Sequence, residues 1–360
     1  MIPTRFALAV CLLVPSLAAR SQTTDQSASA KIGATEFRAI STGKLATFEK
    51  ELSELAGQGF RLERLLESFT VFYQAALLSR QQTEGGAAKY EYKLLTTRRV
   101  STLEKELEAA AAEGYEVRGI MSAGKPYVGS EMVLVLERPA GDKNQRYQYR
   151  ILSETLGQGN KFKDSLQKAI SEGYRPVKVI RNVDVGFGAF FGAGGSPFLM
   201  ILSRKAGDQG ESADDPEYKI LETVRISTLQ KEIDQAAKEG YRLFLYSVGN
   251  VALMARDKRN SQPRYEYRLF KLKNQTEEKE LQTQSQLGYV YRATFGSTTA
   301  LELDLQAGTN SPTREYRFLK FPNKEEEKDK FQKEMSETVT SGFRFLDLTA
   351  WGRLAVILVR

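Results

Sequence analysis

The chain of 360 residues lacks the side chains that most enzymes use for proton transfer and for binding zinc. It has no histidine, and its single cysteine, Cys11, lies in an apolar run near the N-terminus. Histidine is the commonest general base, and histidine and cysteine are the main protein ligands of zinc. The composition therefore argues against Ser-His-Asp hydrolysis, cysteine proteolysis, zinc-dependent hydrolysis and haem ligation through histidine.

Two short motifs could still carry chemistry, but both are incomplete. Ser165 and Lys168 have the spacing of an active-serine motif, but the Lys-Thr-Gly motif that accompanies it is absent. Glu302 and Asp304 could contact a hard cation, although two carboxylates are too few ligands for a complete site. We therefore predict no catalytic residue, no metal site and no cofactor. An enzyme that hydrolyses a glycan with paired carboxylates, and needs no histidine, stays open as an alternative.

The most unusual segment is a long predicted hairpin loop at residues 185–197. It places Phe187, Phe190 and Phe191 among five glycines. Aromatic side chains are costly to expose on a solvent loop, so they suggest contact with a partner, an apolar ligand or a membrane surface. The loop could instead pack over a neighbouring part of the chain as local core.

Two other predicted hairpins carry an aromatic residue beside a basic residue. These pairs are Lys125 with Tyr127, and Trp351 with Arg353. Such tips could bind a polyanionic glycan or a protein, and ordinary turn decoration is the alternative, because lone surface aromatics are common. We predict that these four residues and the three phenylalanines form the binding residues.

These hairpins belong to a unit that occurs six times in the sequence. Each unit opens with a triplet of an acidic or amide residue, an aromatic residue and a basic residue, and later carries Gly followed by Tyr or Phe. The triplets begin at residues 36, 91, 148, 217, 266 and 315, and the Gly pairs begin at residues 59, 114, 173, 240, 288 and 342. Self-similarity of this kind indicates one supersecondary unit used repeatedly.

The second unit shows most clearly how the pattern predicts structure. Residues 90–94 alternate between apolar and polar, as a half-buried strand does. Residues 101–104 (Ser-Thr-Leu-Glu) fit a capping box that would start a helix, and Gly114 would end it in the left-handed conformation. Residues 117–121 and 132–137 predict a second and a third strand.

The predicted fold class is α+β, with six tandem β-α-β-β repeats. Each repeat would form a three-stranded mixed sheet with one helix on one face, and the units would pack together because one unit has too small a core to stand alone. Third strands that are apolar on both sides should be central. In the fifth unit, residues 301–305 alternate Leu with Glu or Asp, which predicts one wet face. The charged triplet residues could form a ladder for a linear polymer or cross-strand pairs on a solvated face.

The first residues are typical of a secretory signal. Arg5 is followed by an apolar run at residues 6–14, too short to span a bilayer, and residues 16–18 (Ser-Leu-Ala) fit a cleavage site. An uncleaved anchor is the alternative. The predicted division of the chain is a signal peptide at 1–18, a disordered leader at 19–33, and repeats at 34–80, 88–139, 145–205, 216–258, 263–306 and 313–360.

Loss of the signal peptide would remove Arg5 and Cys11, and would lower the formal charge from +7 to +6. This mild and dispersed positive charge does not favour nucleic acid as a partner. We predict an exported, periplasmic or secreted, non-enzymatic scaffold that binds an envelope or extracellular protein or glycan. The mature chain should have no transmembrane segment. Homo-oligomerisation through exposed strand edges is a further alternative.

The unit also resembles a family of short bacterial domains of unknown function. Their pattern is Tyr-Glu-Tyr-Lys, a helix, Gly-Trp-Glu and a closing hairpin that ends in a basic residue. Residues 90–93 (Tyr-Glu-Tyr-Lys), 114–116 (Gly-Tyr-Glu) and 136–138 (Leu-Glu-Arg) carry the likeness, with Tyr115 in place of the tryptophan. The resemblance implies a fold and carries no catalytic or binding residues.

The first testable prediction concerns export. If the chain is cleaved after Ala18, protein recovered from the envelope or the medium should begin at Ala19 in N-terminal sequencing. Recovery of membrane-bound protein that still begins at Met1 would replace cleavage with anchoring.

Overall fold

The computed structural model describes residues 35–360 with short gaps. The gaps are residues 67–73, 82–87, 98–99, 126–128, 155–158, 182–197, 209, 211–214, 224, 248–250, 260–261, 272–275, 296–297, 308–312 and 350–353. The predicted signal peptide and leader lie outside the described residues. Ile32–Arg360 form one compact body.

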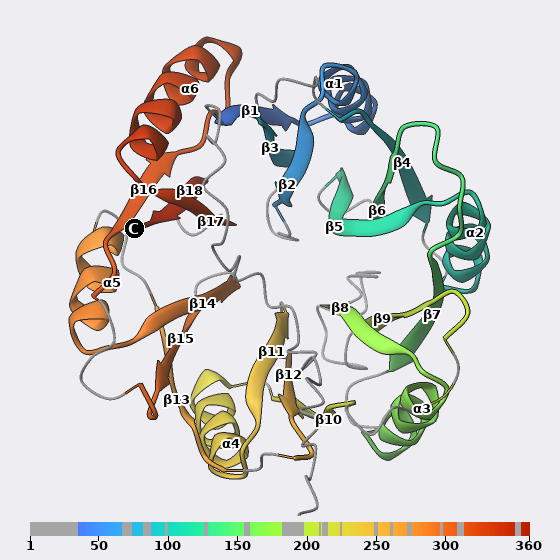
Figure 1. Cartoon of the computed structure of the whole chain (residues 1–360), viewed down its shortest axis with the longest axis vertical. Coiled ribbons are helices and arrows are strands. Elements are labelled where there is room, and N and C mark those ends of the chain that lie inside the picture. Colours follow the sequence, from blue (N-terminus) through green and yellow to red (C-terminus); the bar gives the residue numbers. More distant parts are fainter. Residues whose placement is uncertain are drawn as a thin grey trace, which may run out of the picture. The chain divides into compact units, whose positions relative to one another are not determined.

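Six β-α-β-β units follow one another along the chain (Figure 1). Unit one comprises β1 (Thr35–Thr42), α1 (Leu45–Gly57), β2 (Arg61–Leu65) and β3 (Gln74–Gln81). Unit two comprises β4 (Tyr90–Thr97), α2 (Val100–Ala112), β5 (Glu116–Lys125) and β6 (Gly129–Pro139). Unit three comprises β7 (Tyr147–Glu154), α3 (Gly159–Ser171), β8 (Arg175–Arg181) and β9 (Phe198–Lys205).

The remaining three units have the same order of elements. Unit four comprises β10 (Glu217–Glu222), α4 (Ile226–Lys238), β11 (Arg242–Ser247) and β12 (Val251–Arg256). Unit five comprises β13 (Tyr265–Phe270), α5 (Glu277–Gln286), β14 (Val290–Phe295) and β15 (Thr298–Asp304). Unit six comprises β16 (Tyr316–Lys320), α6 (Glu325–Thr340), β17 (Arg344–Thr349) and β18 (Ala355–Val359).

In every sheet the third strand lies between the first and the second, as in the orders β1-β3-β2 and β16-β18-β17. Both neighbours pair with the third strand antiparallel, so the first and second strands run parallel to each other without pairing. The third strand is central because it is apolar on both faces, and all five residues of β18 are buried. The predicted β-α-β-β repeats and the central third strand are confirmed, but each sheet is antiparallel rather than mixed, because its two outer strands do not pair with each other.

Each second strand contains a β-bulge at the same place. The register shifts between Leu62 and Arg64 in β2, and at the equivalent step in the other five second strands. A bulge turns one side chain out of the regular pleat. Arg118, at the bulge of β5, donates to the carbonyl oxygen of Leu62 in the preceding unit at 3.1 Å. The bulge therefore directs a side chain toward the neighbouring unit.

The glycines after the helices have the predicted conformation. All six have φ between 86° and 95°, the left-handed region. At the end of α2, the Gly114 amide donates to the carbonyl of Ala111 and the Tyr115 amide donates to that of Ala110. These bonds satisfy the last carbonyl groups of the helix and turn the chain into the second strand.

The predicted capping box at residues 101–104 is wrong, because helix α2 already begins at Val100. In unit four the equivalent residues 227–230 (Ser-Thr-Leu-Gln) likewise lie inside α4, which begins at Ile226 after Arg225, and Arg225 makes no side-chain cap hydrogen bond. The side chain of Gln230 binds the next unit instead, since its Nε2 donates to the Tyr267 carbonyl at 3.0 Å and its Oε1 accepts the Leu269 amide at 2.6 Å. Gln230 therefore binds the edge of a strand in the next unit and not the start of its own helix.

Five helices pack on the first strand of the next unit. The pairs are α1 with β4, α2 with β7, α4 with β13, α5 with β16, and α6 with β1. The last pair joins unit six to unit one, and units three and four are joined by contacts between β8 and β11, so the contacts form a closed cycle. In Figure 1 the helices lie at its periphery and the second strands point toward its middle.

Neighbouring units share their cores. Leu103 and Leu107 of α2 pack in one cluster with Tyr149 and Ile151 of β7. At the closing junction, apolar residues of unit one join apolar residues of unit six in the same way. A single unit buries too little apolar surface to be stable alone, and its neighbour supplies the rest.

In the part of the chain that the structure describes, no helix has both the length and the apolar character needed to cross a membrane.

We expect alanine at two of the helix-ending glycines to reduce stability by different amounts. Gly342→Ala should lower the free energy of unfolding by about 1–2 kcal/mol, because an L-residue is strained in the left-handed region. Gly114→Ala should lower it further, because its Cβ would lie 2.8 Å from the Asp142 carbonyl oxygen, whereas the nearest atom to a Cβ at Gly342 is 3.5 Å away. Equal losses in urea denaturation would contradict this packing.

Candidate functional site

The predicted binding residues lie on the hairpins between second and third strands. Phe187, Phe190, Phe191, Tyr127, Trp351 and Arg353 fall outside the described residues. Lys125 is the last residue of β5 and pairs with Gly129 at the start of β6. The polar groups of the described residues form three repeated systems. One lies within single units, and the other two join neighbouring units.

The first system is an arginine clamp within the unit. In unit two, Arg138 of the third strand pairs with Glu91 of the triplet at 2.6 Å and donates to the Glu113 carbonyl oxygen at 2.7 Å. Its guanidinium carbon also lies 4.4 Å from the centre of the Tyr115 ring. The arginines with the same three kinds of contact are Arg80, Arg138, Arg204, Arg256 and Arg360.

The basic residue of the triplet completes this clamp. Lys93 Nζ lies 5.5 Å from the centre of the Tyr115 ring, and Arg150 lies 4.5 Å from the centre of the Tyr174 ring. Cations therefore cover the aromatic residue that follows each helix, an attraction between charge and ring. Outside unit five, the outward residues of the triplets are used in pairs and stacks inside their own unit, so the structure supports the cross-strand interpretation over a free ladder of charges.

The second system joins neighbouring units through the aromatic residue of the triplet. The Tyr92 hydroxyl accepts the amide proton of Leu62 in the preceding unit, at 2.7 Å. The equivalent bonds are Val117 to Tyr149 at 3.0 Å, Leu243 to Tyr267 at 2.8 Å, and Tyr291 to Tyr316 at 3.1 Å.

Two junctions lack this bond, each for a visible chemical reason. Phe37 in unit one has no hydroxyl group. Pro176 in β8 has no amide proton to donate toward Tyr218 of unit four. The two exceptions are three units apart in the cycle, because one lies between units six and one and the other between units three and four.

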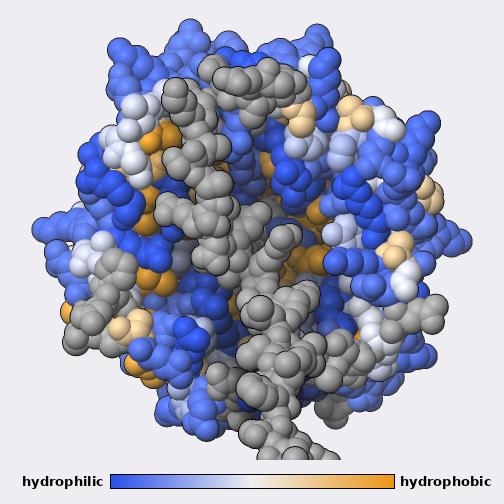
Figure 2. Space-filling model, in the orientation of Figure 1, coloured by the Kyte–Doolittle hydropathy of each residue, from blue (hydrophilic) through white to orange (hydrophobic). Residues whose placement is uncertain are grey.

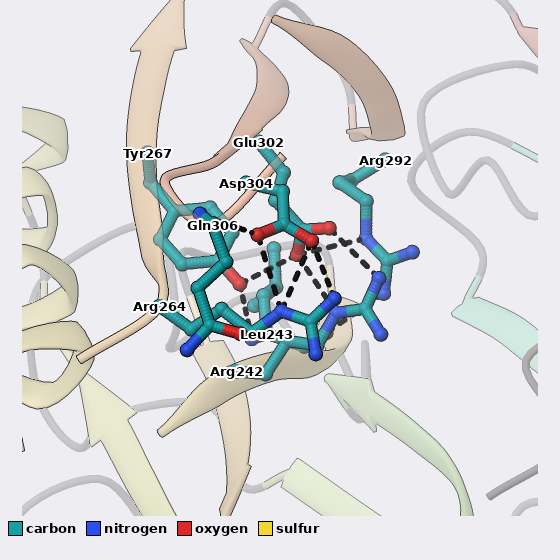
Figure 3. A network of polar contacts seen from close by, with 8 residues as sticks. All are labelled: Arg242, Leu243, Arg264, Tyr267, Arg292, Glu302, Asp304 and Gln306. Atoms are coloured by element: carbon teal, nitrogen blue, oxygen red, sulfur yellow. Dashed lines mark hydrogen bonds and ion pairs between the residues drawn. The ribbon is translucent and has the colours of Figure 1, made fainter. Parts of the chain in front are cut away.

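The third system is a buried carboxylate between two arginines (Figure 3). Glu302 of β15 has a side chain that is only 3% exposed. Arg242 donates to both of its oxygens, at 2.8 and 3.1 Å, and the Tyr267 hydroxyl donates at 2.7 Å. Arg292 lies 3.4 Å from the same carboxylate. Two units thus contribute to one site.

The same network occurs between units one and two. Glu137 takes the place of Glu302, and it binds Arg61, Tyr92 and Arg118. Sequence reasoning missed both networks. The available signal was a glutamate near the end of the third strand, Glu137 or Glu302, but its arginine partners lie on second strands of two units. The predicted wet face of residues 301–305 is also wrong for Glu302, which is buried because arginines compensate its charge.

The pKa values of Tyr267 and Arg242 are shifted away from the neutral range. Burial and the neighbouring Glu302 carboxylate raise the pKa of Tyr267 well above its usual value. Burial acts to lower the pKa of Arg242, but the hydrogen bonds that it donates to Glu302 and the negative charge of that carboxylate together raise it. A general acid or base needs a pKa near the working pH. The network is therefore suited to holding units together and unsuited to proton transfer.

Asp304 is paired as well. It binds the guanidinium of Arg264 at 2.6 Å and accepts the Gln306 amide at 3.0 Å. The hydrogen bond from Arg264 lowers the pKa of Asp304. Because arginines hold both Glu302 and Asp304, this pair is not arranged as a cation site. Among the described residues no cluster of three or more Cys, Asp or Glu side chains could hold a metal ion.

Comparisons of the chain with protein-family models, with curated proteins and with solved structures found no match. The sites of the chain are therefore interpreted by comparing its six units with one another.

Removal of one hydroxyl group should reduce stability at one junction and have almost no effect at another. Tyr267→Phe leaves the Leu243 amide without its acceptor and removes one donor from Glu302, so we expect a loss of about 1–3 kcal/mol in unfolding free energy. Tyr218→Phe is the matched control and should be nearly neutral, because Pro176 offers no amide. Equal effects of the two variants in denaturant titrations would show that the hydroxyl bond does not stabilise the junction.

Proposed function

We propose that this protein is an exported scaffold that binds an envelope or extracellular protein or glycan through the hairpins between its second and third strands. Export rests on the secretory pattern of residues 1–18. The binding proposal rests on the closed cycle of contacts between units, because this cycle places the starts of the hairpins close together.

Equivalent junctions imply equivalent positions for the hairpins. When the same step relates each unit to the next and the cycle closes, corresponding points of all units lie at one end of the cycle axis. The second strands support this, because β2 lies beside β5, β8 beside β11, β11 beside β14, β14 beside β17, and β17 beside β2. Hairpins that leave neighbouring second strands therefore start close together.

The hairpins differ while the framework repeats. The segment between β8 and β9 comprises residues 182–197, whereas only residues 296–297 separate β14 from β15. Variable loops on a rigid, repeated framework are typical of binding proteins. On the face in Figure 2, hydrophilic side chains dominate the surface, and hydrophobic ones show as small scattered groups between them.

The described polar groups favour binding over the alternative of a carboxylate-dependent glycan hydrolase. Such an enzyme needs one protonated and one ionised carboxyl group that face a cleft. The buried carboxylates Glu137, Glu302 and Asp347 instead bind arginine side chains at 2.8 Å. Self-assembly through first-strand edges is also disfavoured, because helices of preceding units pack on the first strands β1, β4, β7, β13 and β16.

We expect the three phenylalanines of the unit-three hairpin to supply apolar contact area. Replacement of Phe187, Phe190 and Phe191 with Ser should preserve the melting temperature and weaken capture of the envelope partner by orders of magnitude, since each buried Phe contributes about 1.5–3 kcal/mol. Phe244→Ser, which changes a 40% exposed phenylalanine on β11, is the matched control. Pull-down from envelope extract and thermal melts of each variant measure the two effects.

The melts and the pull-downs together distinguish the outcomes. A large fall in melting temperature for the triple variant would assign the loop to local core. Unchanged melting and unchanged capture would make the loop a spacer and would place binding elsewhere.

A further inference from the structure

Unit five lacks the arginine clamp that the other five units share. Leu303 stands at the third-strand position of the missing arginine, in register with Glu266 of the triplet. A second replacement accompanies it. The residue before the helix-ending glycine is Leu287, whereas the other units have Gln58, Glu113, Glu172, Glu239 and Ser341 at this place.

The two replacements expose apolar surface at one spot. Three large hydrophobic side chains are exposed in the described part of the chain, and two of them are Leu287 (56%) and Leu305 (51%). Leu303 lies next to Leu287, because its Cδ1 would be 2.9 Å from a Cβ at Gly288, and Leu305 follows two residues later, in the turn after β15. We call Leu287, Leu303 and Leu305 the leucine patch. It lies at the end of β15 away from the hairpin.

The acid beside the leucine patch has lost its usual partner. In unit four, Arg256 binds the equivalent Glu217 at 2.5 Å. Glu266 is exposed and, within the described residues, accepts a hydrogen bond from the Tyr289 hydroxyl only. Burial and this hydrogen bond raise the pKa of Tyr289 to about 12, so the hydroxyl stays a donor and leaves the negative charge on Glu266.

A second carboxylate lies near Glu266. Burial, and then the negative charge of Glu266, raise the pKa of Asp234 on α4. Lys238 on α4 also acts on Asp234, and the two neighbouring arginines are engaged elsewhere. Arg268 stacks on the Tyr289 ring at 4.1 Å and binds Gln284 at 3.1 Å, while Arg264 is paired with Asp304. On a chain with a net positive charge, this spot combines negative charge with exposed leucine side chains.

We propose that the leucine patch and Glu266 bind a segment of another protein that carries an arginine or lysine between apolar side chains. The cation of the partner binds the carboxylate that the chain's own arginine binds in other units. Its apolar neighbours cover Leu287 and Leu305. Opposite charge selects this occupant, because a purely apolar partner would bury Glu266 without compensation. The surface is separate from the hairpins and does not depend on the function proposed for them.

The mature protein can be tested with a fluorescein-labelled peptide, Leu-Arg-Leu-Arg-Leu, in an anisotropy titration. We expect the wild type to bind this peptide saturably. It should not bind the control peptides Leu-Glu-Leu-Glu-Leu and Ser-Arg-Ser-Arg-Ser. Leu303→Arg restores the clamp of the other units, so it should keep or raise the melting temperature and weaken peptide binding at least tenfold. Glu266→Gln should weaken binding similarly, because the amide keeps an acceptor for Tyr289 but removes the charge.

Glu315→Gln in unit six is the matched control, since Arg360 already binds that acid and the peptide affinity should not change. The proposal is wrong if the wild type does not bind the basic peptide, or if Leu303→Arg and Glu266→Gln both bind it as tightly as the wild type. If Leu303→Arg unfolds, Glu266→Gln decides the outcome. Sedimentation of Leu303→Arg and of the wild type compares their oligomeric states. If the states differ, the surface binds a second copy of the chain, and the proposal of another protein as partner is wrong.

Discussion

The outer edge of each first strand carries backbone groups that its own three-stranded sheet cannot pair. The helix of the preceding unit covers that edge, and its side chains supply acceptors for the free amides. Glu104 accepts the Ile151 amide at 3.2 Å, Gln230 accepts that of Leu269, and Glu278 accepts that of Phe318 at 2.7 Å. Unpaired strand edges invite association with other chains. A linear row of such units would leave one first strand uncovered, and the packing of α6 on β1 removes this defect by closing the cycle.

The local parts of the structure could be predicted from the sequence, and the contacts between units could not. Alternation in the strands and the six helix-ending glycines depend on neighbours in sequence, and both gave the β-α-β-β order correctly. The capping box failed because the partner of Gln230 is a strand in the next unit. Burial of Glu302 was missed because its charge is compensated by Arg242 and Arg292, which lie on second strands of different units. The predicted hairpin residues other than Lys125 lie outside the described residues.

The repeated unit divides its polar residues between two tasks. The acid and the base of the triplet act within the unit through the arginine clamp, whereas the aromatic residue acts on the preceding unit. Positions that depart from this scheme are informative, because five other units show what the fold requires there. Phe37 and Pro176 change a junction, and unit five changes a surface. The latter departure exposes Leu287 and Leu305 without any evident gain in packing, which is expected of a binding surface.

Closure of the cycle is the central claim, and a cross-link across the junction of units six and one tests it most directly. The Nζ atom of Lys328 on α6 lies 3.2 Å from the Oε2 atom of Glu51 on α1. With cysteines at these two positions in a chain that carries no other cysteine, a short bifunctional maleimide should join them within one molecule, as read by peptide mass spectrometry. A control with cysteines at Lys328 and at Glu232 in unit four should not cross-link within the molecule. Failure of the first pair to react in folded protein, or equal reaction of the control, would contradict a closed cycle.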